Sequence, residues 1–326
     1  MAGARVVVTG GSGFIGGHLV DKLLARGDEV TVFDREPDPR VRTITGDIRD
    51  EARLAEAIGA GVDVVYHLAA EVGVDRYLTR PLDVIDVNFQ GTRNVLERAH
   101  AAGARVVVAS TSEVFGKNPA VPWAEDADRV LGSTAAGRWT YSSAKAMSEH
   151  LTLAFCAQHG LDATIVRFFN AYGPRQRPAF VLSRTIHRAL NGHPLALYDG
   201  GGQTRCFTFV EDAVAGAMLA GDRGGAGEVF NLGSMTETTV REAITTVAAL
   251  TGAATVEVDA RAALGPAYED VPRRVPDSSK ARRLLGWTAT TSLAEGVART
   301  IDWARANPWW LAQPDSGVAV TVAVAS

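Results

Sequence analysis

Short apolar runs alternate with longer amphipathic segments through the first half of the chain. The runs are rich in β-branched residues and read RVVVTG, EVTVFD, VRTITG, VDVVYHLAA and ARVVVAS, with DATIVRFFNAYG following later. Segments with helical periodicity separate them, after Phe14, after Glu51, across Pro81–Ala102 and after Trp139. Unbroken apolar strands between helices indicate a parallel sheet that is covered on both faces. The pattern therefore predicts an α/β fold with a doubly wound parallel sheet.

The pattern changes beyond Ala171, where two loop-rich stretches lie on either side of a predicted helix over Val181–Asn191. The chain then returns to the first lobe, and Thr239 to about Pro308 predicts a smaller, α-rich lobe. We expect residues 1–170 and 204–236 to form a nucleotide-binding domain, and residues 171–203 and 237–315 to form a substrate-binding lobe. The tail at 316–326 is apolar and β-prone, and the sequence leaves open whether it adds a strand or is a disordered end.

The composition excludes several classes of protein. The 326 residues are 46% hydrophobic and 21% charged, which is typical of a globular chain. A net charge of -4 argues against a surface for nucleic acid or anionic membrane, and no apolar run has membrane-spanning length. The N-terminus lacks the layout of a signal peptide, and Cys156 and Cys206 are too few for a disulfide framework. We therefore expect a cytoplasmic protein. No Cys/His cluster has zinc-ligand spacing, so we also expect no bound metal.

A glycine-rich turn joins the first predicted strand to the first predicted helix. The stretch VVVTGGSGFIGGHLV contains Gly10, Gly13 and Gly16 at the spacing of a dinucleotide-binding turn. Glycines there permit a tight turn, close approach of the backbone to a pyrophosphate, and close packing of helix on strand. The free N–H groups of the helix N-terminus would then face the phosphates.

Two aspartates follow at positions that suit a dinucleotide. Asp34 ends the second predicted strand, where a carboxylate accepts hydrogen bonds from ribose hydroxyls and repels a 2′-phosphate. This position favours NAD over NADP, although Arg35 is next to it. Asp47 has two interpretations that the sequence does not separate: a contact to the adenine amino group, or the N-cap of the following helix.

Tyr141 and Lys145 lie four residues apart at the start of a predicted helix, so their side chains project from one face. A nearby ammonium and a nicotinamide cation both favour tyrosinate over phenol. A tyrosine with that environment can remove a proton from a sugar hydroxyl while a hydride leaves the same carbon. The pair therefore predicts a catalytic base and its supporting cation.

Together these motifs resemble the extended short-chain dehydrogenase/reductase family of NAD-dependent nucleotide-sugar epimerases, dehydratases and decarboxylases. The resemblance covers nearly the whole chain, from TGGSGFIG to PDSSKARRLLGW. It implies a Rossmann-type lobe, a tightly held NAD and a UDP-sugar or related nucleoside-diphosphate-sugar substrate. It also implies a homodimer through the long helices at Pro81–Ala102 and Trp139–His159, although their apolar faces are equally typical of an intramolecular core.

The same resemblance assigns residues to the cofactor, including the HLAA segment that lines it. The residues expected to bind NAD are Gly10, Gly13, Phe14, Ile15, Gly16, Asp34, Asp47, Ile48, Leu68, Ala69, Ala70, Tyr141 and Lys145.

The stretch ASTSEVFG supplies further catalytic candidates. By the resemblance, Thr111 bonds the sugar O4 and helps to polarise the carbonyl that forms there. Simple 4-epimerases usually carry small or neutral residues at the next two positions, and many 4,6-dehydratases carry Asp-Glu. This chain has Ser112 and Glu113, a pair that resembles UDP-glucuronic acid decarboxylases and also GDP-mannose 4,6-dehydratases.

Two more stretches, GRWTYSSAK and DGGGQTRCFT, resemble the decarboxylase domain of bacterial lipid A-modifying enzymes that act on UDP-glucuronic acid. By that match Arg205 lies close to the sugar, where a cation suits a diphosphate and a carboxylate. The remaining residues expected to bind substrate are Asn170 and Arg175 near the diphosphate, Glu269 near ribose and Arg274 near phosphate.

The combined motifs favour a UDP-glucuronic acid decarboxylase that oxidises C4 of the sugar and loses carbon dioxide from C6. A nucleotide-sugar 4-epimerase is the nearest alternative, and a sugar 4,6-dehydratase is the next. A Rossmann-fold protein that senses NAD without turnover is a different class, but such proteins often lose the Tyr/Lys pair that this chain retains.

Overall fold

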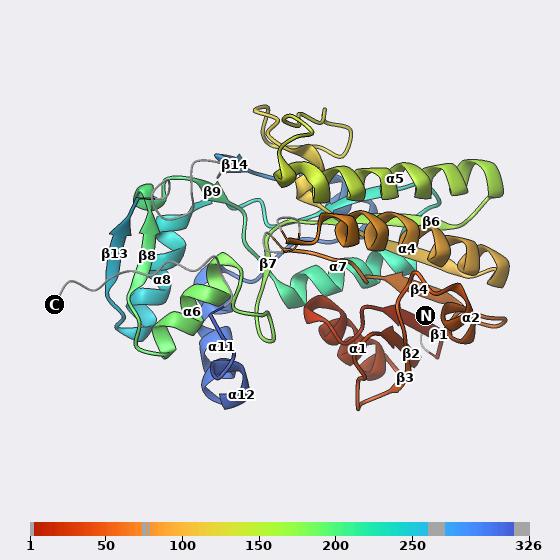
Figure 1. Ribbon diagram of the computed structural model, residues 1–326, viewed down its shortest axis with the longest axis horizontal. Coiled ribbons are helices and arrows are strands. Elements are labelled where there is room, and N and C mark those ends of the chain that lie inside the picture. The colour runs from red at the N-terminus through yellow and green to blue at the C-terminus, as the bar shows by residue number, and fades with distance from the viewer. Residues whose placement is uncertain (1–2, 74–75, 77–78, 260–270, 316–326) are drawn as a thin grey trace.

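The chain folds around a sheet of seven parallel strands, in the order β11-β6-β5-β4-β1-β2-β3 (Figure 1). The computed structural model describes residues 3–73, 76, 79–259 and 271–315. The strand bounds are β1 Arg5–Thr9, β2 Glu29–Asp34, β3 Arg42–Thr45, β4 Val64–His67, β5 Arg105–Thr111, β6 Ala163–Phe168 and β11 Val229–Leu232. The order reverses between β1 and β4, which places a crevice at the carboxyl ends of these two strands.

Alternate residues of the central strand β1 show why both faces of the sheet are buried. Val6 and Val8 belong to one apolar cluster with Leu19 of helix α1, whereas Val7 belongs to a second cluster with Leu96 of helix α4. Successive side chains of a strand point to opposite faces, so an unbroken valine run needs helices on both sides. The predicted fold class, a doubly wound parallel sheet, is therefore confirmed.

The helices that cover the sheet divide between these two faces. Helices α1 and α7 pack against one cluster, and α4 and α5 run side by side over the other (Figure 1). The helix bounds in this lobe are α1 Phe14–Arg26, α2 Glu51–Ala57, α4 Pro81–Ala102, α5 Thr140–His159, α7 Val210–Arg223 and α10 Ser279–Leu285, with short 3-10 turns η1 Ser112–Phe115 and η2 Gly137–Trp139.

A smaller lobe lies at the carboxyl end of the sheet and has its own core. Tyr172, Ile186, Val247, Ile301 and Trp310 are buried together there. The bounds of its elements are α6 Val181–Leu190, β8 Leu195–Tyr198, η3 Asp199–Gly201, α8 Val240–Thr251, β13 Thr255–Val258, α11 Leu293–Arg305 and α12 Pro308–Leu311. The lobe is α-rich, as expected, and β8 and β13 add a parallel pair.

Short strands connect the two lobes beside the crevice. Strand β9 (Thr204–Arg205) lies between β12 (Thr238–Thr239) and β14 (Arg273–Arg274), and β7 (Ala171–Tyr172) pairs with β10 (Thr208–Phe209). Helix α7 and strand β11 then return the chain to the large sheet, where β11 pairs with β6. The crevice is thus bounded by segments that are far apart in sequence.

Candidate active site

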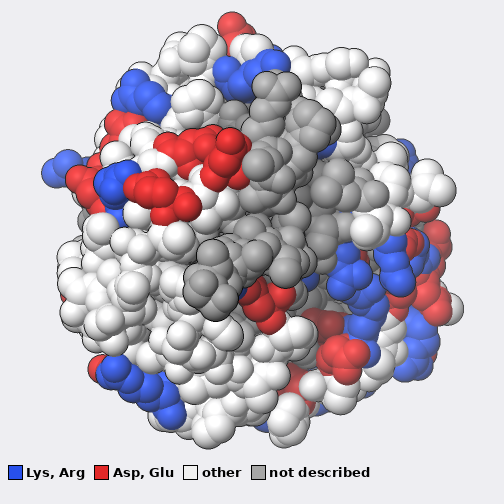
Figure 2. All heavy atoms as spheres, turned by 60° about the vertical axis from the view of Figure 1, so that its left-hand side comes forward, with Lys and Arg blue, Asp and Glu red and all other residues white. Residues whose placement is uncertain are grey.

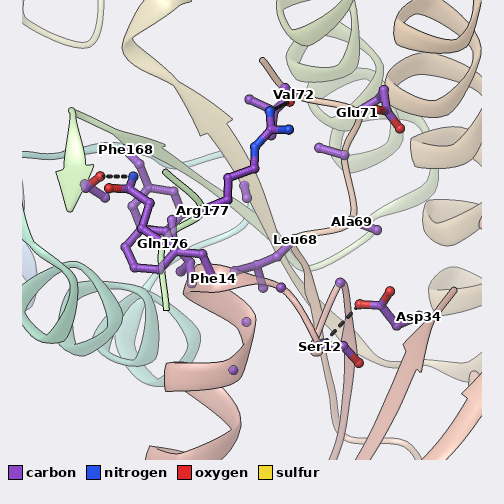
Figure 3. A pocket seen from close by; sticks show the side chains of 18 of the residues that line it. Ser12, Phe14, Asp34, Leu68, Ala69, Glu71, Val72, Phe168, Gln176 and Arg177 are labelled. Atoms are coloured by element: carbon purple, nitrogen blue, oxygen red, sulfur yellow. Dashed lines mark hydrogen bonds between the residues drawn. The ribbon is translucent and has the colours of Figure 1, made fainter. Parts of the chain in front are cut away.

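A cavity of about 920 Å³ opens at the carboxyl ends of the central strands, between the two lobes (Figure 3). The structure brings most of the predicted site residues to its walls. The predicted residues that line it are Gly10, Gly13, Phe14, Ile15, Gly16, Asp34, Asp47, Ile48, Leu68, Ala69, Ala70, Thr111, Ser112, Glu113, Tyr141, Lys145, Asn170, Arg175 and Arg274. Arg205 is held beside these residues, as described below, and Glu269 lies outside the described residues.

The glycine turn permits a close approach of β1, α1 and the β4 end. A Cβ atom at Gly10, whose φ is 75°, would lie 2.6 Å from the backbone nitrogen of Ala69. A Cβ atom at Gly16 would lie 2.0 Å from the carbonyl oxygen of Gly10. No side chain caps the N-terminus of α1, where Gly13, Phe14 and Ile15 line the cavity. Backbone N–H groups at such a helix start suit a diphosphate.

Asp34 lies at the cavity rim, at the end of β2 (Figure 3). Its Oδ2 atom accepts a hydrogen bond of 3.0 Å from the backbone N–H of Ser12, which fixes the carboxylate beside the glycine turn. The adjacent Arg35 is turned toward Glu71, with 3.3 Å between Nη2 and Oε2. The geometry suits a ribose diol at Asp34.

The capping interpretation of Asp47 is wrong. Asp50 caps helix α2, because its Oδ1 accepts from the N–H groups of Ala52 and Arg53. Asp47 instead accepts hydrogen bonds from the backbone and guanidinium of Arg49, which lower the pKa of its carboxyl. The adenine interpretation of Asp47 remains a prediction.

Tyr141 occupies the first turn of α5 and is buried beside the end of β5. Burial raises the pKa of its phenol well above the usual value, and the negative charge of Glu113 raises it further. A hydrogen bond with Thr111, the last residue of β5, acts in the opposite direction and lowers the pKa. Tyr141, Thr111 and Glu113 therefore form one electrostatically coupled group on the cavity wall.

Lys145 lies one turn further along α5 and is 2% exposed. Its Nζ donates a hydrogen bond of 2.9 Å to the carbonyl oxygen of Ala109, two residues before Thr111. Burial lowers the pKa of this ammonium to about 8, and the charge of Glu149 partly offsets that effect. The ammonium is thus anchored to β5. The contributions resolved for the pKa of Tyr141 come from burial, Glu113 and Thr111, and the expected effect of Lys145 is not among them.

Glu113 is held by arginines from three separate segments. Its Oε1 lies 2.9 Å from Nη1 of Arg274, and its Oε2 lies 3.3 Å from Nη1 of Arg138. Burial makes the largest contribution to its pKa and raises it, but the charges of Arg274, Arg138 and Arg205 outweigh burial and lower the pKa overall. The carboxylate is therefore ionised at neutral pH.

Pairing of short strands explains how two of these arginines meet. Arg205 of β9 and Arg274 of β14 are register partners in a parallel pair. The Arg205 guanidinium also donates to the carbonyls of Thr204 and Val271, which fixes its position. Sequence reasoning placed Arg274 at the phosphates and did not assign Arg138, although Arg138 lies three residues before Tyr141 in the stretch GRWTYSSAK.

Two predicted substrate residues have distinct settings. Asn170 has a positive φ of 40°, and its buried Oδ1 atom has no hydrogen-bond partner among the described residues. Arg175 lines the cavity, but its Nη1 atom lies 2.7 Å from Oδ2 of Asp21 on α1. Asn170 thus offers a polar atom for a ligand, whereas Arg175 ties the loop after β7 to α1.

On the face that Figure 2 shows, charge is mixed rather than segregated. Figure 2 shows acidic and basic side chains interspersed over one face, with wide uncharged areas between them. Within the part of the chain that the structure describes, no group of three or more His, Cys, Asp or Glu side chains is placed to hold a metal ion. No helix among the same residues is long and apolar enough to cross a membrane.

Comparison with curated proteins finds relatives over almost the full chain. A UDP-N-acetyl-alpha-D-glucosaminuronate decarboxylase of Bacillus cytotoxicus is 38% identical, covering 92% of this chain and 98% of the relative. UDP-glucuronic acid decarboxylase 1 of Xenopus tropicalis is 34% identical, covering 92% and 72%. A dTDP-glucose 4,6-dehydratase of Streptomyces antibioticus is 35% identical, covering 94% of each chain. Identity alone therefore does not separate the reactions.

The similar solved structures also include proteins with different names and different bound sugars. The structure of MoeE5 in complex with UDP-glucuronic acid and NAD superimposes with a TM-score of 0.82 at 36% identity, covering 93% of this chain and 100% of that one. A UDP-glucose 4-epimerase of Thermotoga maritima, solved with UDP-glucose, superimposes with a TM-score of 0.84 at 30% identity, covering 93% and 99%. Residues 6–233 match the NAD dependent epimerase/dehydratase family. This chain therefore belongs to that family, an NAD-dependent enzyme of the short-chain dehydrogenase/reductase type.

Proposed function

We propose that this protein is a UDP-glucuronic acid decarboxylase, which converts its substrate to UDP-4-keto-xylose, UDP-xylose or both. The observation that carries the proposal is the group of Arg138, Arg205 and Arg274, whose charges act on the carboxylate of Glu113 next to Tyr141. Guanidinium groups gathered at this end of the cavity suit a sugar that brings a carboxylate of its own.

The cofactor-binding side of the cavity fits NAD. The uncapped start of α1 offers N–H groups for the diphosphate, and Asp34 offers carboxylate oxygens for the adenosine ribose. Lys145 would hold the nicotinamide ribose. When bound, NAD supplies a hydride acceptor at C4 of the sugar. The pKa of Tyr141 falls when positive charge enters the crevice, so binding of the oxidised cofactor favours proton removal.

The reaction then follows from the residues around the sugar. Tyr141 removes the proton from the C4 hydroxyl, and Thr111 stabilises the oxygen of the ketone that forms. The C4 ketone is β to the C6 carboxylate, so the bond from C5 to C6 breaks, carbon dioxide leaves, and the electron pair enters an enolate. A proton added at C5 completes the decarboxylation. Arg205 and ionised Glu113 would control the delivery of that proton, directly or through water.

The residue at position 112 distinguishes this chain from the 4,6-dehydratases that carry an Asp-Glu pair. A dehydratase requires an acid that protonates the departing C6 hydroxyl, and many such enzymes carry Asp there. This chain has Ser112, which is buried. A serine hydroxyl is a poor proton donor at neutral pH, so Ser112 argues against the elimination that an Asp-Glu pair catalyses, although the Ser-Glu pair also resembles GDP-mannose 4,6-dehydratases.

A 4-epimerase is the second candidate, and the likeness to the Thermotoga maritima enzyme supports it. An epimerase shares every step up to the ketone and then returns the hydride to the other face of the sugar. The likeness to the Bacillus cytotoxicus enzyme adds a question about the substrate, because an N-acetyl group at C2 would have to fit the same cavity.

The test uses the purified protein with NAD and UDP-glucuronate labelled with ¹³C at C6. We expect ¹³C-labelled carbon dioxide and bicarbonate to appear in the NMR spectrum as the substrate signal falls. Conversion to UDP-galacturonate with the label retained would replace this proposal with the epimerase. A parallel reaction with UDP-N-acetylglucosaminuronate tests the substrate, since faster release of carbon dioxide from it would shift the assignment to the N-acetylated sugar.

A further inference from the structure

Glu149 occupies a buried position on α5, one turn beyond Lys145. Its Oε1 accepts hydrogen bonds from the hydroxyl of Ser110 and from Nε of Arg167, the latter at 2.9 Å, and its Oε2 lies 2.6 Å from Nη2 of Arg167. The side chains of Glu149 and Arg167 are each 9% exposed. One carboxylate therefore joins α5 to β5 through Ser110 and to β6 through Arg167.

We propose that Glu149 is a positioning residue, which fixes the end of β5 through Ser110 and supplies the opposing charge for the Lys145 ammonium, as the reaction requires. Lys145 and Glu149 are four residues apart on α5, so their side chains leave the same face of the helix. Ser110, which Glu149 binds, directly precedes Thr111. This inference rests on the proposed function, because the proposed function gives Lys145 and Thr111 their catalytic roles.

Among the described residues, Glu149 is the acidic group whose charge raises the pKa of Lys145. The other titratable group that interacts electrostatically with Lys145 is His67 on β4. Burial lowers the pKa of His67 to about 3, so this ring is neutral, and its nitrogens bond the hydroxyls of Thr9 and Thr92. The ammonium of Lys145 therefore depends on Glu149 for the opposing charge.

Arg167 is retained by contacts of its own when Glu149 is changed. Its Nη1 donates to the carbonyl oxygen of Glu125, at 2.8 Å, and its guanidinium lies 4.8 Å from the centre of the Phe115 ring. Arg129 also interacts with the charge of Glu149. Because these positive groups remain when the Glu149 carboxylate is removed, the fall in the pKa of Lys145 should be larger.

The experiment measures the protonation of Lys145 directly. The lysines of the chain are Lys22, Lys117, Lys145 and Lys280, so ¹³Cε-lysine labelling gives a spectrum that a Lys145→Arg variant assigns. In Glu149→Gln we expect the pKa of Lys145 to fall below its wild-type value by about one unit. The upper pH limit of kcat should fall by the same amount. An unchanged pKa of Lys145 would overturn the inference.

Two control variants separate charge from packing. Ser110→Ala removes one hydrogen bond and keeps both charges, so the pKa of Lys145 should stay at its wild-type value. Glu125→Gln removes a carboxylate on the other side of Arg167 and should leave both that pKa and the pH limit unchanged. If Glu125→Gln shifted the pKa of Lys145 as much as Glu149→Gln, any nearby negative charge would have the same effect. That result would contradict a specific role for Glu149.

Glu149→Gln leaves Arg167 buried without its acidic partner, and this variant could fail to fold. A double variant keeps the inference testable in that event. Glu149→Gln/Arg167→Gln removes both charges, and the pKa of Lys145 should still fall because the charge of Glu149 is the one that acts on it. The NMR titration needs no substrate. Failure of the wild type to release carbon dioxide would therefore count against the decarboxylase alone, whereas an unshifted Lys145 in an active enzyme would count against Glu149 alone.

Discussion

The two ends of the cavity are built in different ways. At the nucleotide end, the ligand-facing groups are mostly backbone, contributed by one continuous strand–turn–helix segment that includes Gly10, Gly13 and Gly16. At the sugar end, the groups are charged side chains from distant segments: Glu113 after β5, Arg138 in η2, and Arg274 in β14. Backbone geometry can serve any dinucleotide, whereas the charges of the sugar end must match one class of sugar.

The glycine turn and Asp34 suit NAD, the cofactor of the NAD dependent epimerase/dehydratase family, and do not distinguish one reaction from another. The charged groups around Glu113 lie at the end of the cavity where the sugar would react. Changes at the sugar end should therefore alter the rate or the product, and changes at the nucleotide end should alter cofactor affinity.

The largest effect is expected at the sugar end, from Tyr141→Phe. Loss of the phenol oxygen removes the group that takes the C4 hydroxyl proton, so kcat should fall by about 10³-fold or more. NADH absorbance and sugar product measure the rate. NAD affinity and the melting temperature should stay close to the wild-type values, because the ring remains in place. Activity within tenfold of the wild type would refute the proton path through Tyr141.

The next effect is expected at the nucleotide end, from Gly16→Ala. The new Cβ atom would meet the carbonyl oxygen of Gly10 at 2.0 Å, and backbone there has to move. NAD affinity should fall by about 100-fold, roughly the 3 kcal/mol of a displaced diphosphate site. Gly17→Ala is the matched control, because its nearest neighbour is the flexible end of Arg175 at 3.4 Å. Isothermal titration with NAD should find Gly17→Ala close to the wild type.

The same contrast explains which features of the fold and the site could be predicted from the sequence. The sheet and the glycine turn were predictable because valine runs and glycine spacing are local signals, readable within one segment. The arginine group around Glu113 was not predictable as a group, since Arg205 and Arg274 meet only through strand pairing. Asp47 and Asp50 illustrate an ambiguity of a different kind: both lie just before helix α2, and Asp50, which directly precedes Glu51, is the cap because its side chain accepts from the N–H groups of Ala52 and Arg53.

A pH-dependent stability test addresses the charge group at the sugar end. The folded-state pKa of Glu113 lies below its ordinary value of 4.5, so the ionised carboxylate stabilises the fold above that value. This stabilisation is lost as the pH falls through the folded-state pKa. Glu113→Gln should lower the free energy of unfolding at pH 7 by about 2 kcal/mol, and the difference should shrink below pH 4.5.

Urea titrations at several pH values measure that difference, and Glu125 supplies a control of opposite sign. Burial raises the pKa of Glu125, so its ionisation opposes folding as the pH rises through its raised folded-state value. The gap between wild type and Glu125→Gln should therefore change with pH in the other direction. A gap for Glu113→Gln that does not depend on pH would mean that its arginines do not stabilise an ionised carboxylate.

The smallest effect returns to the nucleotide end and separates two neighbouring aspartates. Asp47→Ala should weaken NAD binding by about fivefold if its carboxylate accepts from the adenine amino group, which is the effect of one hydrogen bond of about 1 kcal/mol. Its melting temperature should change little, because Arg49 is partly exposed and loses only a surface partner. Asp50→Ala should behave in the reverse way, with a lower melting temperature from the lost cap of α2 and unchanged NAD affinity. If both variants lowered only the melting temperature, Asp47 would have no part in the cofactor site, and the nucleotide end would reduce to the glycine turn and Asp34.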